Sequence, residues 1–171
     1  MPRRIRLFWL AVNWTYNNKE VLTLSDIPEG VEHFVYIITD ENGRKYIGKK
    51  QILEKRNPEV SKAVYDRLKK EGHPVRRTKN KTKSTKKKIV WRYKKYIIKE
   101  SNWSNYTGSC IPLNREIRAN LKYTKEILHF CKTKKQATYY ELKHQFCQGV
   151  IENDLYWNEN VLSKFFRKDL T

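Results

Sequence analysis

The sequence lacks the features of a membrane-spanning, secreted or disulfide-stabilised protein. Its longest apolar stretch, Leu7 to Val12, is far too short to cross a bilayer. The basic N-terminus has neither the long apolar segment nor the small-residue cleavage site of a signal peptide. The cysteines number three and include no C-x-x-C pair, which argues against a disulfide framework and for a reducing compartment. We therefore expect a cytoplasmic protein with no membrane partner.

Negative charge is also scarce, because 37 Lys and Arg residues face 18 Asp and Glu residues and leave +19 at pH 7. An excess of this size opposes compaction through self-repulsion and predicts a polyanionic partner. No internal repeat or Gly/Ser-rich linker divides the 171 residues, so we expect one domain with extensions.

The basic residues concentrate in two neighbouring segments. Gly72 to Lys88 is basic and polar, and its end, Lys79 to Lys88, holds no apolar side chain, which predicts an arm that is mobile in the free protein. From Ile89 to Lys99, Trp and Tyr residues alternate with cations. That mixture suits nucleic acid, because bases stack on aromatic rings and cations pair with phosphates. An amphipathic helix that buries its aromatic residues fits the same pattern equally well.

A β-hairpin is the clearest structural prediction. Phe34 to Thr39 is rich in β-branched and aromatic residues, Asn42-Gly43 is a strong turn signal, and Lys45 to Lys49 returns as a second strand. Tyr36 and Tyr46 then lie on one hairpin and can face one site.

The remaining elements complete an α+β fold, in which helices flank a small central antiparallel three-stranded sheet. Asn57 can cap a helix that begins at Pro58, and Pro112 can open a second helix. Glu126 to Cys131 predicts the third strand. A helix follows over Lys135 to Phe146, and its expected buried residues are Tyr139, Leu142 and Phe146. Residues 1–30 are expected to add a strand or a helix to this core.

A zinc site is an alternative use of the cysteines and histidines. His129 and Cys131 would share one face of the third strand, while His144 and Cys147 lie one turn apart on the last helix. The four side chains could form a tetrahedral site. Core cysteines and partly exposed histidines explain the same residues, and we favour that interpretation.

The two hairpin segments, Phe34-Val35-Tyr36 and Lys45-Tyr46-Ile47-Gly48, resemble the signature of the GIY-YIG nuclease family, with the first element degenerate. Gly48 would allow close backbone approach beside the second strand. The similarity covers about residues 34–166, and Trp103 to Ser109 resembles a segment of the phage homing-endonuclease (Seg-like) branch. It implies a nuclease domain over 31–171, with a basic insertion at about 72–102.

The resemblance also implies a catalytic set. Arg56 follows Gly48 at the family's interval of eight positions, and Glu141 lies on the helix that carries the family's acidic residue. Asn158 resembles a downstream family asparagine, with Asn160 as a rival. The implied catalytic residues are Tyr36, Tyr46, Arg56, Glu141 and Asn158, with Arg67, Arg115 and Arg118 as alternative cations.

The chemistry of phosphodiester hydrolysis then implies a role for each of these residues. Glu141 would hold Mg²⁺ or Mn²⁺, which needs only one or two carboxylates. Tyr36 would position or deprotonate the attacking water, which requires a lowered phenol pKa, and Tyr46 would be its partner. Arg56 would pair with phosphate oxygens.

The expected substrate is DNA, double-stranded, cut by a monomer or weak dimer encoded by a phage or mobile element. The cations expected to contact it are Lys49, Lys50, Lys86, Lys87, Lys88, Arg92, Lys94 and Lys95. Three readings compete with this one: a non-catalytic nucleic-acid-binding module, a ribosome-associated or RNA-packaging protein, and a GIY-YIG fold that kept binding and lost catalysis. The last is the closest rival, because the first signature element is degenerate and Pro58 interrupts the helix that usually carries the arginine.

Overall fold

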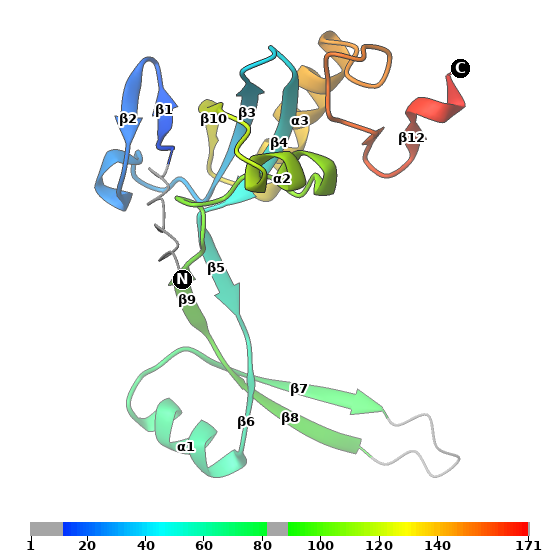
Figure 1. Cartoon of the computed structure of the whole chain (residues 1–171). Coiled ribbons are helices and arrows are strands. Elements are labelled where there is room, and N and C mark those ends of the chain that lie inside the picture. Colours follow the sequence, from blue (N-terminus) through cyan, green and yellow to red (C-terminus); the bar gives the residue numbers. More distant parts are fainter. Residues whose placement is uncertain (1–11, 82–88, 171) are drawn as a thin grey trace, which may run out of the picture. The chain divides into compact units, whose positions relative to one another are not determined.

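The structure, a computed structural model, describes residues 12–81 and 89–170 (Figure 1). The chain divides into two compact units, the first formed by Met1–Ile52 with Asn102–Thr171 and the second by Leu53–Ser101. The second unit begins earlier in the chain than the insertion expected at about 72–102, and it contains Arg56.

A five-stranded sheet in the order β2-β1-β10-β3-β4 forms the centre of the first unit (Figure 1). Its strands are β1 (Trp14–Tyr16), β2 (Lys19–Val21), β3 (His33–Asp40), β4 (Lys45–Gln51) and β10 (Tyr123–Cys131). The predicted hairpin and third strand are confirmed, since β10, β3 and β4 are antiparallel neighbours. Tyr36 lies opposite Gly48 and Ile38 opposite Tyr46, so both tyrosines share one face of the sheet.

Residues before the predicted domain extend this sheet. β1 and β2 form a tight hairpin through Asn17 and Asn18, both with positive φ, and β1 runs parallel to β10. Trp14 is fully buried, and its ring lies 5.1 Å from the rings of Phe34 and Tyr36. The N-terminal extension therefore adds strands, and it completes the core on the face that carries the tyrosines.

The opposite face is covered by α3 (Lys134–Cys147), in agreement with the predicted helix. Of its expected buried residues, Leu142 packs against the core, but Tyr139 and Phe146 are wrong, because they are 62% and 57% exposed. Ala137 and Gln145 are buried instead. Ala137 packs with Val35 and Ile47. A small side chain at this position lets the helix approach the sheet closely. Tyr139 and Phe146 are left on the exposed side of the helix.

Further elements of the first unit surround the sheet. The helix expected at Pro112 is present as α2 (Ile111–Arg118), and Leu113 is its fully buried residue. The short elements are η1 (Leu24–Asp26), β11 (Asn160–Val161), β12 (Phe165–Phe166) and η2 (Arg167–Asp169). Within the described ranges, no helix is long and apolar enough to cross a membrane.

The second unit is built from strands and one helix. β5 (Leu53–Arg56) pairs with β9 (Ile97–Glu100), and a three-stranded sheet has the order β6-β8-β7. The remaining bounds are β6 (Glu59–Val60), α1 (Lys62–Lys70), β7 (Val75–Lys81) and β8 (Ile89–Lys95).

Two predictions for this unit are wrong, and one alternative for its aromatic segment is excluded. The helix begins at Lys62, where Ser61 caps it, because the chain around Pro58 stays extended and pairs with β8. Val75–Lys81 is a strand of an antiparallel ribbon with β8. The aromatic and basic segment after Ile89 is likewise extended and forms β8 and β9, so neither a structureless arm nor an amphipathic helix describes these residues. Lys86, Lys87 and Lys88 lie outside the described residues.

Candidate active site

A cleft of about 430 Å³ lies along β4, the edge strand of the first unit's sheet. Its lining comes from β4, the start of α2, α3 and the C-terminal segment: Tyr46, Lys49, Ser109, Cys110, Ile111, Pro112, Glu141, Gln145, Trp157, Asn158, Glu159, Asn160, Leu162 and Ser163. Because β4 is at the edge, side chains from both faces of the sheet reach the same opening. Tyr46 comes from one face and Lys49 from the other.

The two signature tyrosines are close together but differ in environment. Their ring centroids are 6.2 Å apart. Tyr36 is 1% exposed, whereas Tyr46 lines the cleft with its hydroxyl 3.0 Å from Ser109 Oγ. Burial raises the pKa of Tyr36 well above 10, and nearby Tyr46 and Tyr106 add to the rise. Burial therefore acts against the lowered pKa that a base at Tyr36 would require, and Tyr46 is the phenol that lines the cleft.

The pKa of Tyr46 is raised too, chiefly by burial, while its hydrogen bond with Ser109 acts in the opposite direction. Its hydroxyl is therefore neutral at ordinary pH. A neutral phenol can donate one hydrogen bond and accept others. It can thus orient water or a phosphate oxygen without first losing its proton.

Two glycines make room for this tyrosine pair. A Cβ on Gly48 would lie 2.5 Å from the Tyr36 hydroxyl oxygen. A Cβ on Gly108 would lie 2.8 Å from Tyr46 Cε1, and the φ of +91° at Gly108 also disfavours other residues. The segment that resembles the Seg-like branch thus supplies the second wall of the tyrosine site. Close approach at Gly48 is confirmed, with a side chain as the group that approaches.

Glu141 reaches the cleft from α3 and forms an ion pair with Lys49 of β4. The two side chains are 14% and 26% exposed for Glu141 and Lys49 respectively. Lys49, one of the cations expected to contact DNA, is thus bound to the candidate metal ligand. Lys50 donates to Asn102 Oδ1 at 2.7 Å, and its ammonium lies over the Tyr106 ring.

The cleft's donors fit a hard divalent cation better than zinc. Two carboxylates line it, Glu141 and Glu159. Mg²⁺ and Mn²⁺ are satisfied by one or two carboxylates with water and substrate oxygens. The alternative zinc site gains no support, because no group of three or more His, Cys, Asp or Glu side chains occurs among residues 12–81 and 89–170. The three cysteines, all within these ranges, are free thiols.

Asn158 is 4% exposed and binds both main-chain groups of Ile47 on β4. Its Oδ1 accepts from Ile47 N at 3.0 Å, and its Nδ2 donates to Ile47 O at 2.9 Å. Gln145 Nε2 adds a second bond to that oxygen at 3.2 Å. Asn158 therefore holds the edge strand at Ile47, between Tyr46 and Gly48. Its rival, Asn160, also lines the cleft and accepts from Ser163 N.

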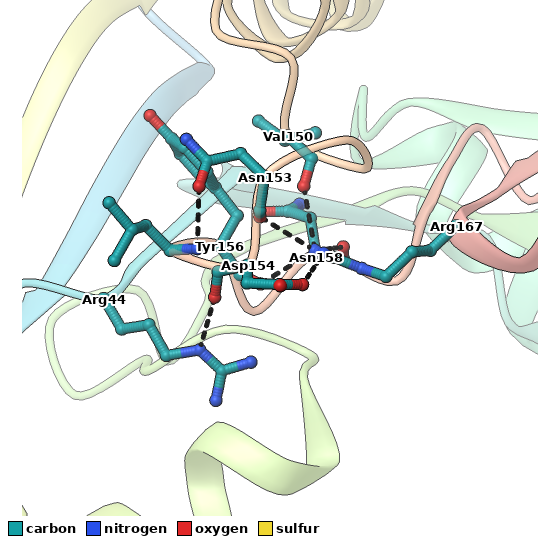
Figure 2. Close-up of polar contacts among 8 residues, drawn as sticks. Arg44, Val150, Asn153, Asp154, Tyr156, Asn158 and Arg167 are labelled. Atoms are coloured by element: carbon teal, nitrogen blue, oxygen red, sulfur yellow. Dashed lines mark hydrogen bonds and ion pairs between the residues drawn. The ribbon is translucent and has the colours of Figure 1, made fainter. Parts of the chain in front are cut away.

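Arg167 fixes the segment that delivers Asn158 (Figure 2). Its Nη2 lies 3.0–3.3 Å from the carbonyl oxygens of Val150, Asn153, Tyr156 and Asn158. Its Nη1 is 2.7 Å from Asp154 Oδ1, and Arg44 Nε donates to Asp154 O from the other side. One planar guanidinium thus gathers the carbonyls of a loop. Main-chain hydrogen bonds from Lys45 N to Leu155 O and from Trp157 N to Lys45 O join that loop to β4.

The arginines proposed from the sequence do not line the cleft. Arg56 is on β5 of the second unit, where its guanidinium binds Glu54. Arg67 belongs to α1 of the same unit, and Arg115 and Arg118 are exposed residues of α2. In the described part of the chain, Lys49 is the one basic side chain of the cleft lining.

Sequence reasoning missed several polar residues of this cleft, among them Glu159, Gln145 and Ser109. Glu159 directly follows Asn158, Gln145 lies one helical turn after Glu141, and Ser109 follows Gly108. Adjacency to a candidate residue was the available signal for each of them.

The tyrosine pair, the facing glutamate and the sheet define a domain of the GIY-YIG nuclease class. Residues 14–161 match the family described as "Putative endonuclease segE, GIY-YIG domain", and the chain belongs to this family. The predicted family, including its Seg-like branch, is thereby confirmed. Comparison with curated proteins and with solved structures gave no significant match.

Proposed function

We propose that this protein is a divalent-metal-dependent endonuclease that hydrolyses phosphodiester bonds of double-stranded DNA in the cleft along β4. Membership of the family supports a nuclease. One observation carries the assignment to this cleft: Tyr46 and Glu141 come from opposite faces of the sheet and line the same opening. The resemblance to the Seg-like branch is the ground for proposing a phage or mobile-element origin.

Glu141 is the residue that would hold Mg²⁺ or Mn²⁺, with water and substrate oxygens as the other ligands. When bound, such an ion stabilises the negative charge that develops on the phosphate. Lys49 keeps the Glu141 carboxylate paired in the absence of the ion. A Lys49 ammonium released from Glu141 would be available to a phosphate oxygen, so this lysine would have a role both without and with the ion.

Hydrolysis forms a bond from a water oxygen to phosphorus and breaks the bond to the leaving 3′ oxygen, which gains a proton. Tyr46, held by Ser109, would orient the water or a non-bridging oxygen through its neutral hydroxyl. Tyr36 would support the Tyr46 ring from the core. Arg56 remains the proposed source of a bidentate phosphate contact, since a planar fork matches phosphate better than an ammonium does.

A plasmid-nicking assay with Mg²⁺ or Mn²⁺ tests the proposal. Glu141→Gln should lower turnover by at least about 10²-fold, because the ion's charge stabilisation is lost with its ligand. DNA affinity in EDTA should stay within about threefold, because the substitution leaves the DNA-binding cations in place. Calorimetric titration of the free protein with Mn²⁺ should show weakened binding.

Glu159→Gln is the matched control, since it removes the other carboxylate of the same cleft. It should retain most of the activity and of the Mn²⁺ binding. Activity of Glu141→Gln within tenfold of wild type, or a larger loss in Glu159→Gln, would refute Glu141 as the main ligand. Wild-type binding without any nicking would support the rival hypothesis of a GIY-YIG domain that binds DNA without cutting it.

A further inference from the structure

The second unit holds most of the protein's net positive charge. Residues 53–101 include 18 Lys and Arg against 5 Asp and Glu, a net of +13 within the +19 of the whole chain. This density opposes compaction of so small a unit unless an anionic partner neutralises it. The charge therefore indicates that the unit's own surface binds a polyanion, separately from the cleft of the first unit.

β7 and β8 form an antiparallel ribbon (Figure 1). The register of the pair places the charged residues of the ribbon on two faces. Arg76 lies opposite Lys94, and Thr78 lies opposite Arg92. Directly opposed residues of an antiparallel pair project from the same face, and residues two apart do so too. Arg76, Thr78, Arg92 and Lys94 thus share one side of the ribbon, which we call the outer face.

The other side of the ribbon carries α1. Tyr93 is on that side, and its ring packs 5.0 Å from the ring of Tyr65 in α1. Trp91 shares that side and lies beneath the Arg77 guanidinium, 4.1 Å from its ring centroid. Aromatic contacts within the unit therefore occupy the face that α1 covers. Arg77, Lys79 and Lys95 also lie on the α1 side, so both faces carry cations. The outer face differs in that its cations, Arg76, Arg92 and Lys94, lie beside Thr78 and away from α1, with Val90 as an exposed apolar residue of the same face.

We propose that the outer face of the β7–β8 ribbon is a docking surface for double-stranded DNA and enters the major groove. A two-stranded ribbon fits that groove, which is about 12 Å wide. Arg and Lys pair with phosphates and with the guanine edge, and a Thr hydroxyl can bond to any base edge. DNA as the particular polyanion rests on the proposed nuclease function.

Glu59 allows the surface to be tested by a gain of DNA affinity as well as by a loss. Its carboxylate is 2.7 Å from Arg92 Nη1, and both side chains are about half exposed. Glu59 lies opposite Lys94 in the β6–β8 pair, so it belongs to the same face. It orients Arg92 but also repels phosphate. Glu59→Gln should therefore tighten DNA binding, whereas loss of the cations should weaken it.

The decisive measurement is the salt dependence of duplex affinity in EDTA, where cleavage cannot occur. Each phosphate contact contributes roughly 0.9 to the slope of log affinity against log salt. The triple variant Arg76→Gln, Arg92→Gln, Lys94→Gln should flatten the slope by about two to three units. Between 50 and 200 mM salt, the wild type should then lose about 40-fold more affinity than this variant if all three cations contact phosphate.

A second triple variant provides the matched control. Lys62→Gln, Lys69→Gln and Lys70→Gln remove the same charge from exposed positions on α1. The control should change the slope by less than one unit. Equal flattening in both triples would overturn the proposal, because it would show a diffuse charge effect instead of a docking face.

Two further readouts guard against misfolding and against another ligand. Circular dichroism should be the same for all variants, and Glu59→Gln should bind more tightly than wild type at low salt. Unchanged or weaker binding by Glu59→Gln would overturn the proposal, as would tighter binding of single strands than of duplex. Because binding is measured without metal, failure of the nuclease proposal would appear in the nicking assay alone.

Discussion

Lys125 should make the stability of this protein depend on pH between about 8 and 10.5. The side chain lies in the core of the first unit, and the residue is only 2% exposed. Its ammonium donates to Ser104 O at 2.7 Å and lies 4.7 Å from the Trp14 ring centroid. Burial lowers the pKa of Lys125 from 10.5 to about 8.

The lowered pKa of Lys125 determines whether stability rises or falls with pH. Between pH 8 and 10.5 the unfolded chain keeps the Lys125 proton while the folded protein loses it. The unfolded state therefore binds more protons, and the free energy of unfolding rises with pH. Each pKa unit corresponds to about 1.4 kcal/mol, so the buried charge costs about 3 kcal/mol at pH 7 and about 1 kcal/mol at pH 10.

Lys125→Met removes the cost of the buried charge, because methionine is neutral and fills similar space. The substitution forfeits the bond to Ser104 O and the contact with Trp14, which together contribute about 2 kcal/mol at any pH at which lysine is charged. We expect Lys125→Met to be slightly more stable than wild type at pH 7. The free energy of unfolding of Lys125→Met minus that of wild type should be about 2 kcal/mol smaller at pH 10 than at pH 7.

Urea denaturation followed by tryptophan fluorescence at pH 7, 8, 9 and 10 measures this difference. Tyrosine ionisation affects both proteins and cancels in the comparison. Lys122→Met, at an exposed position on the segment leading to β10, is the control and should differ from wild type by the same amount at every pH. A Lys125→Met difference that is constant within about 0.5 kcal/mol from pH 7 to 10 would refute a desolvated ammonium.

Five further substitutions test the site. Tyr46→Phe should lower nicking turnover by about 10²-fold, the scale of a positioned proton-transfer group, and Tyr36→Phe by less; the reverse order would make Tyr36 the phenol that meets the substrate. Gly48→Ala should cost about 1–3 kcal/mol of unfolding free energy by overpacking, and combining it with Tyr36→Phe should recover part of that loss because the clashing oxygen is gone. Asn158→Leu should lower both the melting temperature and turnover, whereas a loss of turnover at unchanged stability would indicate a direct catalytic role. Arg56→Lys should lower turnover with DNA affinity unchanged, and full activity of this variant beside an inactive Arg115→Ala or Arg118→Ala would move the catalytic cation to α2.

The sequence alone could predict the hairpin of β3 and β4, because its information is local. The turn residues set the register, and the register decides that Tyr36 and Tyr46 share a face. The helix carrying Glu141 was likewise predictable from a run of good helix formers, and its place in the chain pointed to the family. These features need no knowledge of what packs against them.

The second unit shows why local reasoning fails where pairing is distant. Val75–Lys81 carries few apolar residues, so composition predicts a mobile arm. It becomes a strand because β8 supplies hydrogen-bond partners and Tyr65 of α1 covers the ribbon at Tyr93. The buried side of α3 was mispredicted at Tyr139 and Phe146 for a related reason, since contact with the distant strands of the sheet places Ala137 and Leu142 on the core side.

The chemistry of the candidate site divides in the same way. The sequence determined which residue types are present, their order and the family to which they belong. Only the tertiary structure decided that Tyr36 is enclosed while Tyr46 lines the cleft, that Lys49 binds Glu141, and that Asn158 is committed to Ile47. Burial, pKa and hydrogen-bond partners depend on groups brought together from distant parts of the chain, and local sequence patterns do not encode those distances.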